Sequence, residues 1–141
     1  FRRYCAKVIY ELKLHRDDLR VLDAHFKPTR KKYRTMANCY ADIQRKATKI
    51  QYIKTNYLLD VDGGMYSVEY VQAWLMETML KTKLRTLYGK KWWSDKRSGD
   101  FLKTIWQHGT TGLAIHELAR TLGYPKLSIK PLTDDFLKVF T

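Results

Sequence analysis

The segment LAIHELARTLG, residues 113–123, begins like the zinc-binding helix motif His-Glu-x-x-His. In that motif, two histidines one helical turn apart share a face, so that both imidazoles reach one metal ion. Here Arg120 holds the second histidine position, and a guanidinium has no lone pair to offer a metal. The spacing excludes this zinc site. It predicts that His116 and Glu117 lie on a solvated helix face while Leu118 is buried.

The remaining metal-ligating and nucleophilic residue types also form no local site. The two cysteines, Cys5 and Cys39, form no Cys-x-x-Cys pair, and Cys5 falls on the apolar face of an expected helix, as a buried inert thiol does. No local Ser/His/Asp or Cys/His arrangement is present. We therefore expect no metal ligands and no cofactor in this chain. No two of its four histidines are one helical turn apart: His15, His25, His108 and His116.

The stretch VDGGMYSVEYVQAW, residues 61–74, is the most distinctive in the chain. Tyr66 and Tyr70 are four residues apart at the start of an expected helix, so their hydroxyls can point the same way, toward the turn made by Gly63 and Gly64. An uncharged phenol can donate a hydrogen bond to an oxyanion that develops on a polarised carbonyl. The alternative is that both tyrosines lie at the edge of a core.

The charge pattern indicates a second possible chemistry. The formal net charge is +13, from 27 Lys and Arg against 14 Asp and Glu, which implies attraction to polyanions or acidic partners at low salt. The basic residues could hold phosphates while Trp92 and Trp93 stack on bases. The alternative is a solvated surface, since no known nucleic-acid-binding motif accompanies the charge. The residues concerned are Arg30, Lys31, Lys32, Arg34, Lys90, Lys91, Lys96 and Arg97.

Length and composition limit the class of protein and its compartment. A chain of 141 residues with 45% hydrophobic and 29% charged side chains suits one folded domain. Two cysteines without a disulfide framework suit a reducing interior, so we expect a cytoplasmic protein. No apolar run approaches the roughly 20 residues of a membrane span, and we find no signal peptide. Because the chain starts at Phe1 rather than Met, we expect a piece of a longer protein.

Helical periodicity predicts an all-α fold, a single domain over residues 1–141 with six or seven helices and no significant sheet. Its expected parts are N-terminal helices over 1–50, a Gly-rich loop over 51–67, and a long central helix with C-terminal helices over 68–141. Asp60 and Asp62 flank the Gly-rich turn, and turn formation accounts for them.

Within the first part, we expect a helix over 2–15, a short helix that Asp17 caps, and a helix over 29–50 capped by Thr29. Within the last part, we expect a helix that is capped by Ser67 and ends at Tyr88, before Gly89. A second helix begins at Ser98 and turns Phe101, Leu102, Ile105 and Trp106 inward, and a third runs from Thr111 to Leu122. Pro131 starts a last helix, whose apolar residues are Leu132, Phe136, Leu137 and Phe140.

Residues 57–136 resemble the C-terminal helical region of bacterial zinc metallopeptidases related to oligoendopeptidase F and thimet oligopeptidase. The resemblance is carried by NYLLDVDGGMYSVEYVQAWLMETMLKTKLRTLYGKKWWSDKRSGDFLKTIWQHG followed by HELARTLGYPKLSIKPL. The segment RRYCAKVIYELKLH, residues 2–15, looks like an earlier helix of the same region. Residues 16–50 match least. No histidine stands shortly before Gly63, where that family has one.

The resemblance implies that zinc binding and substrate binding lie in different parts of the enzyme. In that family His-Glu-x-x-His and a downstream glutamate hold zinc, both upstream of the region seen here, and the C-terminal region forms a wall of the substrate cleft. The family's Gly-Tyr-rich motif binds substrate and stabilises the transition state, and GGMYSVEY is similar to it. The resemblance thus implies catalytic roles for Tyr66 and Tyr70, and substrate binding at Gly63 and Gly64. The implied partners are an upstream catalytic half and a peptide substrate.

Two function hypotheses from different classes follow. The first is the substrate-cleft part of a gluzincin-type metallopeptidase, inactive alone because the zinc site lies elsewhere. The second is a basic helical module that binds nucleic acid or another polyanion. A scaffolding domain without a ligand is a third possibility. Whether the chain acts as part of a hydrolase stays open at this point.

Overall fold

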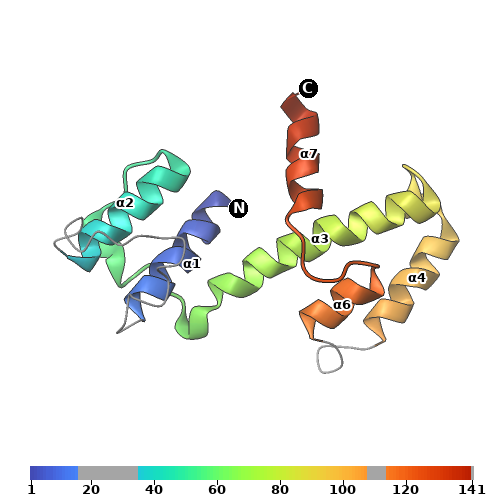
Figure 1. Cartoon of the computed structure of the whole chain (residues 1–141), viewed down its shortest axis with the longest axis horizontal. Helices are drawn as coiled ribbons and strands as arrows, with labels where there is room; N and C mark the ends of the chain where they lie inside the picture. The colour runs from blue at the N-terminus through green and yellow to red at the C-terminus, as the bar shows by residue number, and fades with distance from the viewer. Residues whose placement is uncertain (16–34, 108–113, 141) are drawn as a thin grey trace. The chain divides into compact units, whose positions relative to one another are not determined.

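The computed structural model describes residues 1–15, 35–107 and 114–140 (Figure 1). These residues contain six α-helices and no β-strand, which confirms the predicted all-α fold. The chain divides into two compact units, Phe1–Val71 (unit 1) and Gln72–Thr141 (unit 2), and the boundary lies inside α3. The helices are α1 (Arg2–Leu14), α2 (Met36–Thr48), α3 (Ser67–Tyr88), α4 (Lys96–Trp106), α6 (Ile115–Thr121) and α7 (Lys130–Phe140).

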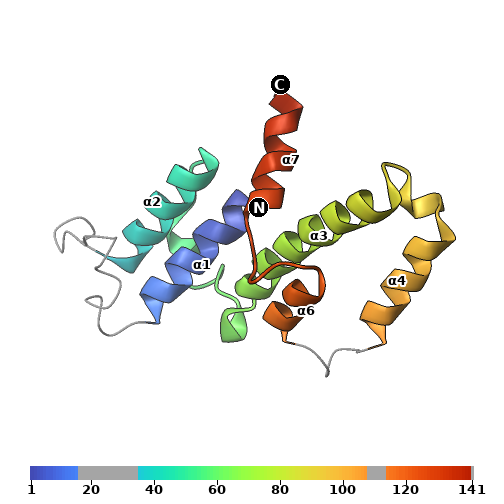
Figure 2. The ribbon, with the colours of Figure 1, turned by 45° about the vertical axis from the view of Figure 1, so that its right-hand side comes forward.

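Unit 1 is built on the packing of α1 against α2, which lie side by side in Figures 1 and 2. The predicted helix over residues 2–15 is confirmed and ends one residue earlier. Tyr10 of α1 and Tyr40 of α2 are buried and meet edge to face, with ring centroids 5.2 Å apart. The Tyr10 hydroxyl donates to the Tyr57 carbonyl at 2.8 Å, so this core also holds the segment that follows α2.

Helix α2 starts later than the sequence predicted. Thr35 has an extended backbone, with φ −148° and ψ 159°, and its side chain accepts a hydrogen bond from the Asn38 N–H, as an N-cap does. A helix running unbroken over 29–50 is therefore wrong. The predicted cap Thr29 and the predicted short helix after Asp17 lie outside the described residues.

Helix α3 ends as predicted but starts differently. Gly89 takes a left-handed φ of 79° directly after Tyr88, which is the usual conformation after a helix C-terminus. Ser67, predicted as the N-cap, is itself the first helical residue and is buried. Its hydroxyl donates to Oδ2 of Asp62 at 2.8 Å instead of capping the helix.

The core of unit 2 joins α3, α4 and α6. Helix α4 starts at Lys96, two residues before the prediction, because Asp95 accepts a hydrogen bond from the Arg97 N–H and caps the helix. Helix α6 starts at Ile115, and residues 108–113, where the prediction placed its start, lie outside the described part. The buried residues of this core are Met76, Met79, Ile105, Ala119 and Leu122.

Some residues predicted to face inward in unit 2 are exposed. Helix α4 turns Phe101 and Ile105 toward the core, so Trp106, one residue further on and about 100° around the helix, is 66% exposed. In α7, Leu132 is buried whereas Phe136 and Leu137 are exposed. The Phe140 side chain lies outside the described atoms.

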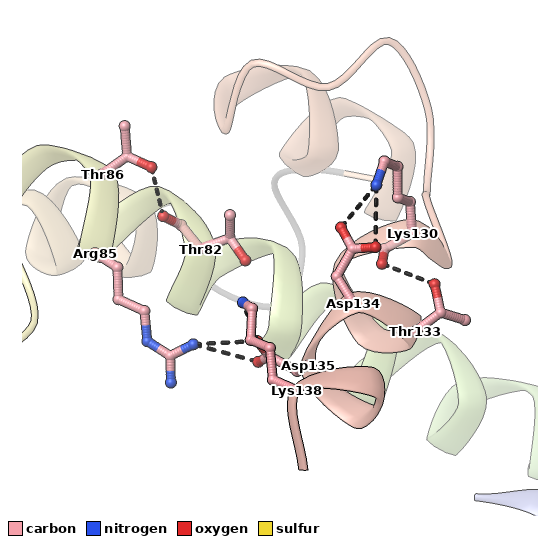
Figure 3. A network of polar contacts seen from close by, with 8 residues as sticks. All are labelled: Thr82, Arg85, Thr86, Lys130, Thr133, Asp134, Asp135 and Lys138. Atoms are coloured by element: carbon pink, nitrogen blue, oxygen red, sulfur yellow. Dashed lines mark hydrogen bonds and ion pairs between the residues drawn. The ribbon is translucent and has the colours of Figure 1, made fainter. Parts of the chain in front are cut away.

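Ion pairs tie α7 to α3 and support its own helix (Figure 3). Nη1 of Arg85 in α3 lies 3.3 and 3.4 Å from the two carboxylate oxygens of Asp135 in α7. Lys138 donates to Asp135 at 3.1 Å, and this bond, with the Arg85 charge, lowers the pKa of the Asp135 carboxyl. Lys130 and Asp134 form a second pair within α7 at 2.8 Å. Polar contacts thus hold a helix whose apolar side is only partly covered.

We expect Leu122→Ala to destabilise unit 2 by about 2–5 kcal/mol, because it removes a buried side chain from a packed core. All four tryptophans lie in unit 2, at positions 74, 92, 93 and 106, so tryptophan fluorescence during urea unfolding reports this unit alone. The control is Leu87→Ala in α3, where the side chain is half exposed and the expected loss is below about 1 kcal/mol. Equal losses would contradict the described core.

Candidate functional site

Tyr66 and Tyr70 lie together on the surface of unit 1, at the start of α3. They are 49% and 40% exposed, and their rings meet edge to face with centroids 5.0 Å apart. Tyr4 of α1 joins them, with its ring centroid 4.9 Å from that of Tyr70. The two tyrosines that the sequence singled out are therefore in contact with each other. We call Tyr4, Tyr66 and Tyr70 the tyrosine cluster.

The pKa of Tyr70 is raised above its ordinary value. The first cause is the neighbouring Tyr66 phenol, whose charge when ionised disfavours a second phenolate, and the second is a hydrogen bond between the two side chains. The carboxylates of Asp62 and Glu69 act in the same direction. Tyr70 is therefore a neutral phenol at neutral pH, and a neutral phenol can donate a hydrogen bond to an oxygen that gains negative charge.

The glycine turn before the cluster has an unusual backbone. Gly64 and Met65 are both left-handed, with φ values of 63° and 58°. A side chain at φ 58° costs roughly 1–2 kcal/mol, so Met65 is a strained residue. A Cβ added at Gly63 or at Gly64 would meet no atom within 4 Å. Gly64 is thus required for its conformation, and the space outside both glycines is open. This turn lies directly before Tyr66.

A buried cation holds the segment that carries this turn. Lys7 of α1 is only 7% exposed, and its Nζ lies 2.9 Å from Asp62 Oδ1 and 3.6 Å from Asp60 Oδ1. Arg3, one turn earlier, lies 2.8 Å from Asp60 Oδ1. Hydrogen bonds from Lys7 and then from Ser67 lower the pKa of Asp62. Because a buried ammonium is costly without partners, these contacts fix the turn against α1.

Glu11, one turn after Lys7, holds the same segment through its backbone. Glu11 is fully buried, and its Oε1 accepts a hydrogen bond from the Asp62 N–H at 3.0 Å and lies 3.4 Å from the Ser67 hydroxyl. Tyr40 of α2 donates to Asp60 Oδ2 at 2.9 Å. The other oxygen of Glu11, Oε2, is buried and has no hydrogen-bond partner among the described residues. We call this network the loop clamp; its residues are Arg3, Lys7, Glu11, Tyr40, Asp60, Asp62 and Ser67.

Sequence reasoning missed the loop clamp. Asp60 and Asp62 were interpreted as turn formers, whereas the structure uses both carboxylates as acceptors for groups on α1 and α2. A signal was present: Arg3, Lys7 and Glu11 recur every four residues and so share one face of their helix with the apolar side chains. Charged residues on that face indicate a buried polar network.

The other candidate ligands lie apart from this site. Among the described residues, no three His, Cys, Asp or Glu side chains gather as a metal site would require. Cys5 is half buried rather than fully buried, and burial raises the pKa of its thiol. His116 and Glu117 are exposed and Leu118 packs on the core, as predicted. The carboxylate of Glu117 accepts a hydrogen bond from the Ala114 N–H at the start of α6.

The predicted basic residues are only partly described. Arg30, Lys31, Lys32 and Arg34 lie outside the described residues. Lys90, Lys91, Lys96 and Arg97 are exposed around the turn between α3 and α4, in unit 2.

Searches against protein families, curated proteins and solved structures found no match to this chain. None of the helices in the described ranges is both long enough and apolar enough to cross a membrane.

We expect Glu11→Ala to destabilise unit 1 by about 2–4 kcal/mol, because it leaves the buried Asp62 N–H without an acceptor and removes a charge from a paired network. Hydrogen exchange of the α1 and α2 amides, followed by mass spectrometry, measures this loss. Glu69→Ala is the matched control: Glu69 is exposed in the first turn of α3, and we expect its removal to cost less than about 1 kcal/mol. Similar exchange in the two variants would show that the loop clamp contributes little.

We expect Tyr66→Phe to lower the pKa of Tyr70 toward the ordinary tyrosine value, because the variant removes both the neighbouring ionisable phenol and its hydrogen bond. In the unaltered protein, the Tyr70 phenolate should form only when the pH exceeds the ordinary pKa of a tyrosine. NMR of ¹³C-labelled tyrosine side chains between pH 8 and about 12 resolves the individual titrations. A Tyr70 titration that is the same in both proteins would contradict the described contact.

Proposed function

We propose that the tyrosine cluster is a peptide-contacting surface in a zinc-metallopeptidase-like protein, where this chain supplies one wall of the substrate cleft. The observation that carries the proposal is the exposed pair Tyr66 and Tyr70, whose side chains are hydrogen-bonded to each other. The pair lies directly after a strained glycine turn. Two phenol hydroxyls at one surface are suitable donors for the oxygen of a reacting peptide carbonyl. The resemblance of GGMYSVEY to the Gly-Tyr-rich motif of that family points to the same residues.

The loop clamp supports this proposal through preorganisation. A donor stabilises a transition state best when it is already held in position before the substrate binds. Lys7 and Glu11 hold Asp62 on one side of the turn, and Ser67 holds it on the other side. The backbone that carries Tyr66 is thus fixed at both ends, although it has no sheet or helix partner of its own.

In such a protein, zinc supplies a polarised carbonyl and an activated nucleophile. The resemblance is our reason to assign zinc to an upstream catalytic half of a longer protein. The role of this chain is to bind the peptide and to donate hydrogen bonds from Tyr66 or Tyr70. Free thiols at Cys5 and Cys39 support a reducing compartment, and we propose the cytoplasm.

We expect Tyr66→Phe or Tyr70→Phe to lower kcat by about 100-fold or more, with little change in KM, because the lost hydrogen bond acts mainly in the transition state. The assay uses an internally quenched peptide and a natural form of the protein that carries both this region and a His-Glu-x-x-His segment.

The control is Tyr52→Phe, which removes a hydroxyl from a half-buried ring of the same unit that packs against Tyr40. We expect it to retain its activity. Unchanged turnover in both cluster variants, or an equal loss in the control, would reject the proposed role of Tyr66 and Tyr70.

A further inference from the structure

The turn between α3 and α4, residues 89–95, exposes a large aromatic ring. Trp93 is 68% exposed, and it meets the half-buried Trp92 edge to face with centroids 5.9 Å apart. A tryptophan that exposes most of its surface gives up burial energy, and such rings concentrate where a partner covers them. Most of the Trp93 side chain is therefore open to solvent beside the Trp92 ring.

Three lysines flank this ring and have no acidic partner in the part of the chain that the structure describes. Lys90, Lys91 and Lys96 are exposed and form no ion pair with any described residue. Arg97, predicted to act with them, is already engaged: its Nη2 lies 2.7 Å from Asp95 Oδ2, and its guanidinium lies over the Tyr88 ring at 5.7 Å. The charge available to a ligand therefore comes from the lysines, on both sides of Trp93 in the sequence.

A shallow hollow of about 450 Å³ lies beside the ring, lined by Trp92, Trp93, Gly99 and Leu102 among others. Two acidic residues also line it, but both are paired: Asp95 with Arg97, and Asp100 with Lys103 at 3.4 Å. The lining also holds Lys96 and Lys103, so its own charges balance. The hollow thus combines apolar surface with one lysine, Lys96, that forms no ion pair with a described residue. Its volume lies within the range of small-ligand sites.

The turn is held firmly by its own hydrogen bonds. Ser98 is buried, and its hydroxyl contacts the Trp92 carbonyl and the Asp95 carbonyl. The Asp95 side chain accepts from the Arg97 N–H at 2.9 Å. Because these bonds fix the backbone on both sides of Trp93, a ligand that covers the ring does not have to order the loop first.

We infer that this turn binds single-stranded nucleic acid, with a base stacked on Trp93 and phosphates held by Lys90, Lys91 and Lys96. Successive bases stack on exposed aromatic side chains, and lysines contact the backbone, in proteins that bind single strands. An acidic peptide would use the lysines but gains little from a flat ring, so Trp93 distinguishes the two ligands. The inference concerns unit 2 and does not depend on the peptidase proposal for unit 1.

The test uses the full chain and a fluorescein-labelled dT12 oligonucleotide, with binding followed by anisotropy at about 50 mM salt. We expect three phosphate contacts to make the Kd rise about 20-fold on going to about 200 mM salt. We expect Trp93→Ala to weaken binding about 10-fold or more, since it removes one stacked base. Trp106→Ala is the matched control, because Trp106 is equally exposed at the other end of α4.

A pair of double variants with the same net charge separates a local site from general attraction. Lys91→Gln with Lys96→Gln should make the salt dependence shallower by about 1.4 in log–log slope. Lys54→Gln with Lys126→Gln, at exposed lysines that lie elsewhere and make no ion pair with a described residue, should leave both the slope and the Kd nearly unchanged. Circular dichroism checks that all variants keep their helix content.

Three results would overturn the inference: no binding of dT12 at low salt, equal losses in the two double variants, or full binding by Trp93→Ala. Competition by polyglutamate as effective as competition by unlabelled dT12 would also overturn it, because that result identifies a general anion surface. All of these readouts concern nucleic-acid binding, so their failure is distinct from a failure of the peptidase assay.

Discussion

The arrangement of unit 1 depends on two ionisable side chains of α1 that are buried. Lys7 and Glu11 lose nearly all contact with water, and such desolvation costs several kcal/mol for each ion unless partners compensate it. The compensating groups come from residues 60–67, more than fifty positions along the chain. Helix α1 and this irregular segment therefore have to fold together, since neither satisfies its polar groups alone.

The same constraint explains how a strained turn persists. Gly64 and Met65 take left-handed conformations in a segment that is itself neither a strand nor an α-helix. Strain of this kind survives where the surroundings fix the backbone from several sides. Here Asp62 is held from α1 before the turn, and Ser67 is buried after it. The exposed tyrosines thus stand on a rigid base, as binding residues placed on a supported loop usually do.

The sequence predicted features that depend on neighbours along the chain. Helical periodicity located all six described helices, and Gly89 and Pro131 marked a helix end and a helix start because their backbone preferences are local. The four-residue spacing of Tyr66 and Tyr70 likewise predicted their contact. The start of α2 was wrong because Thr29 and Thr35 give the same capping signal in the sequence, and the extended backbone of Thr35 is known only from the structure.

Features that depend on distant residues were beyond such reasoning. The bonds of the loop clamp that reach α1 and α2 join residues 20 to 57 positions apart, so no spacing rule contains them. The exposure of Trp106 could not be predicted for the same reason. Periodicity did not show which side of α4 faces the core, and the structure shows that the side with Ile105 does. Sequence reasoning therefore placed the candidate residues on their elements but did not show what holds them there.

Pairing also decides where the excess positive charge of the protein can act. Every aspartate among the described residues forms an ion pair with a lysine or an arginine. The net charge of +13 is consequently not spread evenly, because paired lysines present little field beyond their partner. It is concentrated at lysines that form no ion pair with a described residue, as at Lys90, Lys91 and Lys96. A polyanion would therefore be attracted to these unpaired lysines, rather than equally to every basic residue of the protein.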